Sequence, residues 1–317
     1  MEKGLRYVLN VVLSLLLISL IIYFTGMDKI VVTITAMSTS LFLMAILIEN
    51  VGVMVSAKKW HMLLMMKEVQ IPFTTAWKYY YIGTFFNAFF PTTVGGDVIK
   101  AYGLSQHLNK KEEAFSSAIM DRITGLAAVL IIGSIAIIIG WQVIPHTALV
   151  LSLIILLLPL VMIVLIFTTD AVGRLMRWSL FAKFGRLTTL MEQIYASLRE
   201  YRLNGRLLLP VFVLSLIYHG ILVINNYVLS QALGLDIPLY YFFIFIPIAE
   251  ILVFLPVTIQ GFGVREGTYV TLFSSIGVGS VQAFSLGFSN QLIKLIGNII
   301  GGVVYAFNSK RAERIKN

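Results

Sequence analysis

Apolar stretches, each long enough to cross a bilayer, follow one another along most of this chain. They lie at about 7–25, 34–56, 114–140, 147–168, 207–233 and 283–307. About 20 apolar residues cross the hydrocarbon core of a bilayer as one helix. The chain has 58% hydrophobic and 12% charged residues, whereas soluble globular proteins have about 25% charged residues. We therefore predict an all-α, polytopic membrane protein with about six full spans.

Two further apolar segments, at about 77–99 and 239–276, are interrupted by related motifs. The motifs read Phe90-Pro91-Thr92-Thr93-Val94-Gly95-Gly96-Asp97-Val98-Ile99-Lys100 and Leu255-Pro256-Val257-Thr258-Ile259-Gln260-Gly261-Phe262-Gly263-Val264-Arg265-Glu266. Paired broken helices are typical of transporters built from two inverted halves. We predict two re-entrant helical hairpins, which makes eight hydrophobic segments in all, related by a pseudo-inverted repeat.

Basic residues predict the orientation. Nineteen of the 24 lysines and arginines fall in the segments 1–6, 57–76, 100–113, 169–206 and 308–317. All five segments lie on one side if the two hairpins enter from opposite faces, and basic loops favour the cytoplasm. We predict that both termini are cytoplasmic. Eight full spans would also place both termini inside, so that topology stays an alternative.

The chain is expected to form one integral membrane domain over 1–317. Its parts are half one at about 1–168, a cytoplasmic amphipathic linker at 169–206, half two at about 207–307 and a basic cytoplasmic tail at 308–317. In the linker, apolar residues recur at helical spacing, namely Phe184, Leu187, Met191, Ile194, Leu198 and Tyr201. This pattern predicts an interfacial helix. It either gathers anionic lipids or serves only as a connector resting on the membrane.

Composition excludes several classes of function. The chain has no cysteine, and its four histidines are scattered at spacings unlike those of metal ligands. The segment from Gly261 to Gly267 reads G-x-G-x-x-x-G, which is one residue too long for the dinucleotide fingerprint. The net charge of +9 is explained by membrane orientation. We expect no metal, no cofactor and no nucleic-acid partner.

Charged residues at the two helix breaks are candidates for function, because ionisable groups inside a membrane are expensive. Arg122 and Arg265 could hold a phosphate by bidentate hydrogen bonds, while Asp97, Asp121 and Glu266 orient them or relay protons. The alternative is that these charges only pair to hold helices together, as Glu49, Glu250 and Lys294 within apolar runs also could. The candidate residues for substrate binding or translocation are Asn87, Pro91, Gly95, Gly96, Asp97, Lys100, Asp121, Arg122, Gly261, Gly263, Arg265 and Glu266.

Gly297 and Gly301 form a G-x-x-x-G pattern in the last apolar run. Such a pattern lets two helices approach closely. We favour packing within the chain, and a homodimer interface stays the alternative.

Three motifs together resemble one known family. They are Asn87-Ala88-Phe89-Phe90-Pro91-Thr92-Thr93-Val94-Gly95-Gly96-Asp97, Asp121-Arg122-Ile123-Thr124-Gly125-Leu126 and Gly261-Phe262-Gly263-Val264-Arg265-Glu266-Gly267. In this order they resemble the flippase-like family named after the transmembrane region of lysylphosphatidylglycerol synthase, the multiple peptide resistance factor. The resemblance covers nearly the whole chain and implies a prokaryotic inner-membrane protein of the lipid-flippase type. The full-length synthase carries a soluble aminoacyl-transfer domain; we expect no such domain here and therefore no lysyltransferase activity.

The function expected from the sequence is movement of anionic or aminoacylated phospholipid, or of lipid-linked head groups, between leaflets. Two rival functions stay open. One is a polyprenyl-lipid transferase with Asp97 or Glu266 as general base. The other is a partner of a separate lipid-modifying synthase or glycosyltransferase.

Overall fold

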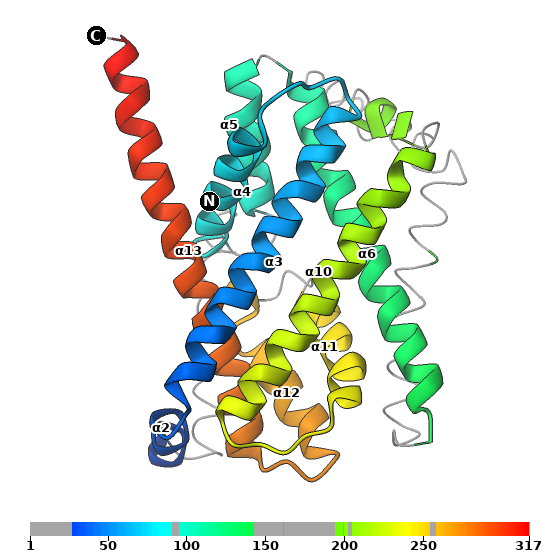
Figure 1. Ribbon diagram of the computed structural model, residues 1–317, viewed down its shortest axis with the longest axis vertical. Coiled ribbons are helices and arrows are strands. Elements are labelled where there is room, and N and C mark those ends of the chain that lie inside the picture. The colour runs from blue at the N-terminus through cyan, green and yellow to red at the C-terminus, as the bar shows by residue number, and fades with distance from the viewer. Residues whose placement is uncertain are drawn as a thin grey trace, which may run out of the picture.

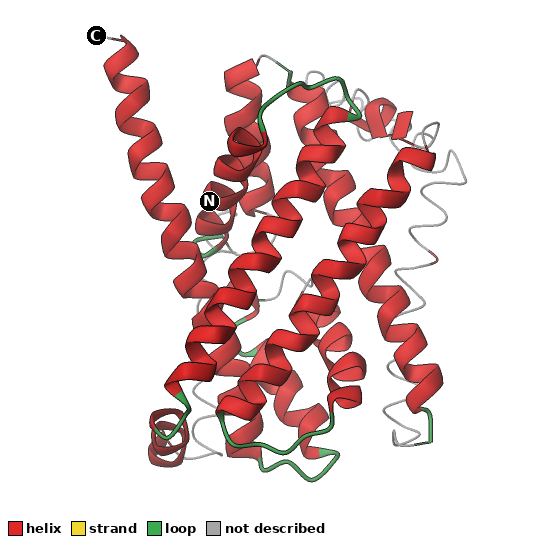
Figure 2. Ribbon diagram, viewed as in Figure 1, coloured by secondary structure: helices red, strands yellow, loops and turns green. Residues whose placement is uncertain are grey.

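Long helices form the body of the molecule. The computed structural model describes residues 27–90, 95–108, 110–142, 161, 194–198, 200–201, 205–253 and 258–316, and within these residues the regular structure is helical, with no strand (Figure 2). Four helices are long and apolar enough to cross a membrane: α3 (Thr39–Met65), α6 (Lys111–Gly140), α10 (Gly205–Ala232) and α13 (Ser280–Lys316). They run roughly along the long axis of the molecule, and the short α2 (Met27–Thr35) lies at its lower end (Figure 1).

These four helices confirm four of the six predicted spans. The predicted spans at 7–25 and 147–168 lie outside the described residues, apart from Val161. The findings establish a multi-pass helical membrane protein.

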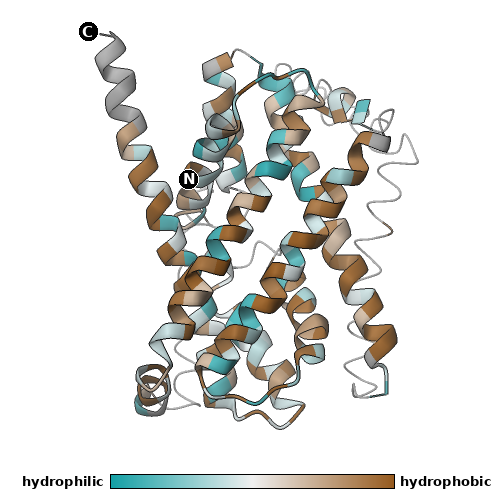
Figure 3. Cartoon of the chain, viewed as in Figure 1, coloured by the Kyte–Doolittle hydropathy of each residue, from teal (hydrophilic) through white to brown (hydrophobic). Residues whose placement is uncertain are grey.

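The long helices are largely apolar, with polar residues interspersed along them (Figure 3), and many of their large apolar side chains are exposed while several polar ones are buried. In α3 the buried face carries Glu49, Ser56 and Lys59, whereas Leu47 and Val51 are more than half exposed. Because lipid is the solvent for such a surface, the outward apolar faces need no further partner, and the polar residues gather within the bundle.

Each motif segment forms a pair of short helices joined by a break. The first pair is α4 (Phe73–Asn87) and α5 (Gly95–Leu108). The second pair is α11 (Leu239–Val253) and α12 (Val264–Ser274), with a short 3-10 turn η2 (Ile259–Gly261) between them. A helix of 15 residues, such as α4 or α11, is only about 22 Å long, which is short of the roughly 30 Å hydrocarbon core.

The two short pairs lie toward opposite ends of the molecule. In Figure 1, α4 and α5 occupy the upper part, and α11 and α12 lie in the lower part. The helix α13 packs against both α4 and α12. Helix α13 is therefore in contact with both pairs of short helices.

The first described span extends further than predicted, into the basic segment at 57–76. Helix α3 continues to Met65, so the first part of this segment is helical, and Lys59 is buried while Lys58 is exposed. The helical repeat explains the difference, because Lys59 extends the inward face of Glu49 and Ser56 at spacings of seven and three residues. Lys100, counted with the loop 100–113, is likewise buried in α5.

Part of the predicted amphipathic linker packs on protein. Residues 194–198 and 200–201 are described as helical, while most of 169–206 lies outside the described residues. Leu198 and Tyr201 belong to an apolar cluster with Leu63, Met120 and Val211. Here the apolar face of the linker covers the ends of α3, α6 and α10.

We expect Tyr201→Phe to lower the free energy of unfolding by about 1 kcal/mol, the net value of one hydrogen bond. The buried Tyr201 hydroxyl donates to the carbonyl oxygen of Leu63 at 3.0 Å, which lies at the end of α3. Phenylalanine keeps the packing and leaves that carbonyl without this donor. Thermal unfolding of the purified protein in detergent measures the effect, and an unchanged melting temperature would mean that the linker is not held by this bond.

Candidate functional site

A polar cavity of about 210 Å³ lies within the bundle. It is lined by five basic side chains, Lys59, Lys100, Arg122, Arg265 and Lys294, and by four acidic ones, Glu49, Asp97, Asp121 and Glu250. The long helices α3, α6, α10 and α13 and all four short motif helices contribute to its wall. With its histidine neutral, the cavity wall carries one excess positive charge.

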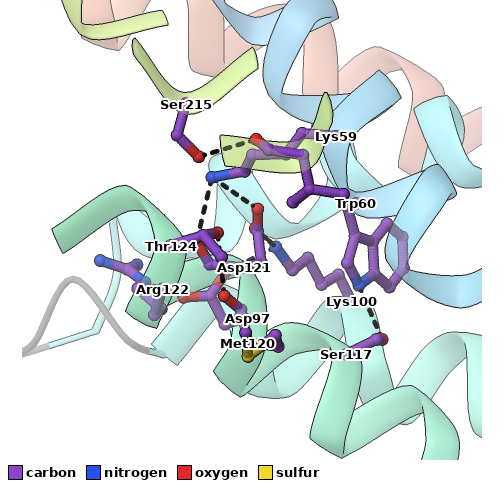
Figure 4. A network of polar contacts seen from close by, with 11 residues as sticks. Lys59, Trp60, Asp97, Lys100, Ser117, Met120, Asp121, Arg122, Thr124 and Ser215 are labelled. Carbon is purple, nitrogen blue, oxygen red and sulfur yellow. Dashed lines mark hydrogen bonds and ion pairs between the residues drawn. The ribbon is translucent and has the colours of Figure 1, made fainter. Parts of the chain in front are cut away.

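The first group of charges joins α3, α5 and α6 (Figure 4). Asp121 binds two lysines: its Oδ1 lies 2.9 Å from Lys59 Nζ and its Oδ2 lies 2.7 Å from Lys100 Nζ. Lys100 Nζ also lies 2.9 Å from Asp97 Oδ1, and Arg122 Nε donates to Asp97 Oδ2. Three cations thus surround two carboxylates.

Aromatic rings complete the surroundings of Lys100. Its ammonium group lies 4.2 Å from the centre of the Tyr80 ring and 5.0 Å from that of Trp60. Trp60 is fixed in turn by a 3.0 Å hydrogen bond from Nε1 to Ser117 Oγ. Ring faces attract cations, and they do so more strongly where water is excluded. The rings therefore help to hold a fully buried lysine.

The second group of charges joins α11, α12 and α13. Glu250 Oε1 lies 2.7 Å from an Arg265 terminal nitrogen and 3.1 Å from Lys294 Nζ. The same Arg265 nitrogen donates to Asn290 Oδ1 at 2.9 Å. Arg265 and Asn290 are buried, and Nε of Arg265 has no hydrogen-bond partner in the described part of the chain. Arg122 of α6, paired with Asp97 of the first motif segment, and Arg265 of the second motif segment thus line one cavity.

Glu266 has a local structural role in this geometry. Its carboxylate accepts a 2.6 Å hydrogen bond from the backbone N–H of Gly263 and so caps the start of α12. Gly261 and Gly263 both have φ near +81°, a backbone conformation that favours glycine. Glu266 is fully buried and does not line the cavity. Of the two adjacent candidates, Arg265 therefore lines the cavity and Glu266 does not.

The facing ends of α4 and α5 pack tightly together. The backbone N–H of Gly96 donates to Asn87 Oδ1 at 2.7 Å, and Asn87 also lines the cavity. A side chain on Gly96 would overlap the carbonyl oxygen of Gly83 on α4. A side chain on Gly95 would overlap Phe90. Pro91, the remaining candidate in this motif, lies outside the described residues.

Asn298 on α13 connects the two motif segments. With its amide oriented to suit its neighbours, it donates to the Thr84 carbonyl oxygen at 3.0 Å and accepts from Gln260 Nε2 at 2.9 Å. Thr84 belongs to α4 and Gln260 to η2. The two motif segments therefore meet through one buried amide at the cavity wall.

Sequence reasoning missed several residues of the wall, including Lys59, His219 and Asn298. A signal existed for Lys59 in the spacing of Glu49, Ser56 and Lys59 along α3. The others need tertiary contacts to be found. No group of three or more histidine, aspartate or glutamate side chains that could hold a metal ion occurs among the described residues.

The fold and the site define a class of protein: a multi-pass helical membrane protein with a charged cavity enclosed by its spans. The family described as "Lysylphosphatidylglycerol synthase TM region" matches residues 7–302, and the chain belongs to it. It is also similar to the UPF0104 membrane protein PH1989 of Pyrococcus horikoshii, with 22% identity over 334 residues, covering 98% of each chain. No solved structure matches the chain at a significant level.

Proposed function

We propose that the cavity receives the polar head of an anionic phospholipid or lipid-linked molecule and passes it between leaflets. The acyl chains stay in the surrounding lipid. The observation that carries this proposal is that Arg122 and Arg265, one near each helix break, line one polar cavity. Membership of a family named for a lipid synthase's membrane region supports a lipid as the substrate.

The physical task of such a protein is to lower the cost of moving charge through hydrocarbon. A phosphate in lipid loses its hydration, and a bilayer core offers nothing in exchange. The cavity offers five cations fixed by carboxylates, together with amide groups of Asn87, Gln260 and Asn298. Guanidinium groups suit phosphate because their planar donors match two of its oxygens.

The proposal includes a topology. The short pairs α4–α5 and α11–α12 are too short for two full crossings each and lie toward opposite ends of the molecule (Figure 1). We propose that they are re-entrant hairpins related by a pseudo-inverted repeat. In the inner membrane, both termini would then face the cytoplasm, as the positions of the basic residues indicate.

The test is leaflet movement of fluorescent phosphatidylglycerol in liposomes that hold the purified protein. We expect the Arg122→Ala/Arg265→Ala variant to lose translocation because both phosphate-binding candidates are removed. The variant is expected to fold, since Asp97 keeps Lys100 and Glu250 keeps Lys294 as a partner. Lys58→Ala, at an exposed position beside Lys59, is the matched control.

The outcomes separate the candidate functions. Normal movement by a folded double variant would contradict the assignment of the cavity. If the wild-type chain moves none of several anionic and polyprenyl lipids, the role as partner of a lipid-modifying enzyme becomes the better explanation. Turnover of a labelled donor in detergent would instead favour the transferase.

A further inference from the structure

Three of the four carboxylates that line the cavity are each held by two cations. Asp97 contacts Lys100 and Arg122. Asp121 contacts Lys59 and Lys100. Glu250 contacts Arg265 and Lys294. This pairing satisfies all five cations of the cavity wall before the fourth carboxylate is counted.

Glu49 is the fourth carboxylate, and its surroundings differ. It is 7% exposed on α3 and lines the cavity. In the described part of the chain its one printed hydrogen bond comes from the amide of Asn225, with 3.1 Å between Nδ2 and Oε2, and no cation lies within ion-pair distance. A buried carboxylate without a cation is expensive to keep ionised.

Titratable and charged groups surround Glu49 on the neighbouring helices and in the same cavity wall. They are Tyr81 on α4, Asp121 and Arg122 on α6, Tyr218 and His219 on α10, Glu250 on α11, Arg265 on α12 and Lys294 on α13, with Lys59 further along α3 itself. The two cations nearest in the cavity, Arg265 and Lys294, are already bound to Glu250. The positive charges of Arg265 and Lys294 act on Glu49 through space, but neither side chain forms a hydrogen bond with it.

The charge of Glu49 therefore decides the charge of the cavity. With Glu49 ionised, the wall carries five positive and four negative groups, and with Glu49 neutral it carries five and three. The Asn225 amide can donate to the carbonyl oxygen of a neutral carboxyl group as well as to a carboxylate. Proton exchange at Glu49 therefore breaks no ion pair, whereas at Asp97, Asp121 or Glu250 it would weaken two.

We propose that Glu49 is a proton-binding site which couples the passage of an anionic head group to that of a proton. A proton from water binds a Glu49 carboxylate oxygen as the anion enters, and it returns to water when the anion leaves. Because the effects of two ligands on each other are reciprocal, the bound anion favours the protonated Glu49, and the protonated Glu49 strengthens binding of the anion. The inference rests on the proposed function and adds its coupling ion.

The first experiment measures phosphatidylglycerol movement in vesicles between about pH 5.5 and pH 8, a range in which the phosphodiester keeps its charge, so that any pH dependence comes from the protein. Extraction of the short-chain fluorescent lipid by albumin provides a readout. For the wild type we expect the rate to rise toward acidic pH by up to about tenfold per pH unit, the limit for one proton. Glu49→Gln should move lipid at a rate that no longer depends on pH, because glutamine mimics the protonated acid. Asp236→Asn, at an exposed position in a loop, should behave as the wild type.

A second experiment does not depend on transport. Dihexanoyl phosphatidylglycerol is added to the protein in weakly buffered detergent, and a pH-sensitive dye reports proton uptake. We expect uptake by the wild type and none by Glu49→Gln. No uptake by a wild type that binds the lipid, or the same pH dependence in both proteins, would overturn the inference. Absence of wild-type translocation at any pH would instead count against the proposed function.

Discussion

Asp121→Ala should lower the free energy of unfolding by about 3–5 kcal/mol, the cost of breaking a buried ion pair by removing one partner. Asp121 lies 5% exposed between Lys59 and Lys100, which are also buried. Lys100 keeps Asp97 as a partner after the change, whereas Lys59 keeps only the backbone carbonyl oxygen of residue 121. The main cost therefore comes from the uncompensated charge of Lys59.

A double variant tests that explanation. Lys59→Met in the Asp121→Ala background removes the unpaired charge and keeps an unbranched apolar side chain. We expect the double variant to recover most of the lost stability, because an ion pair replaced as a whole costs far less than one broken. Unfolding in mixed micelles, monitored by circular dichroism, gives the free energies of unfolding of the wild type, the Asp121→Ala variant and the double variant. Equal losses in the single and double variants would show that packing around Asp121, and not charge, determines stability.

Hydropathy alone was enough to predict four spans, because α3, α6, α10 and α13 have to be apolar on the face that meets lipid. The helix breaks were also predictable, since proline and paired glycines interrupt two apolar segments. The wall of the cavity was harder. Arg122 and Arg265 lie far apart in the sequence, and only tertiary packing shows that both line one cavity with Asn298 between the hairpins.

Two residues show why sequence reasoning misassigned other parts of the site. Lys59 follows another lysine and lies in the basic segment 57–76, so charge counting assigns it to a loop, while the helical register of α3 turns it inward. Glu266 follows Arg265, so charge alone makes it a partner in the site. The direction of its side chain depends on the positive φ of Gly263, because the Glu266 carboxylate accepts a hydrogen bond from the N–H of Gly263. Backbone conformation of this kind is invisible to charge counting.

Gly301→Ala should destabilise the protein by about 1–3 kcal/mol, the usual cost of forcing extra volume into a packed interface. A Cβ on Gly301 would overlap the carbonyl oxygen of Tyr81 and crowd Cβ of Phe85, both on α4. Because Gly301 meets the backbone of α4 directly, the two helices have little freedom to adjust. Separation of α13 from α4 would also displace one wall of the cavity, so we expect lipid movement to fall as well.

Gly297→Ala is the matched control, one helical turn away on the same helix and lining the cavity, with no heavy atom within 4 Å of the added carbon. The pair separates the two explanations of the G-x-x-x-G pattern. Packing within the chain makes Gly301 alone sensitive, and stability should then be independent of protein concentration. A dimer interface would make the stability sensitive to substitution of either glycine. Dilution in detergent would then lower the stability as well, and size-exclusion chromatography with light scattering would detect the dissociation of the dimer. Because Gly301 already meets the α4 backbone in a single chain, we expect the first result.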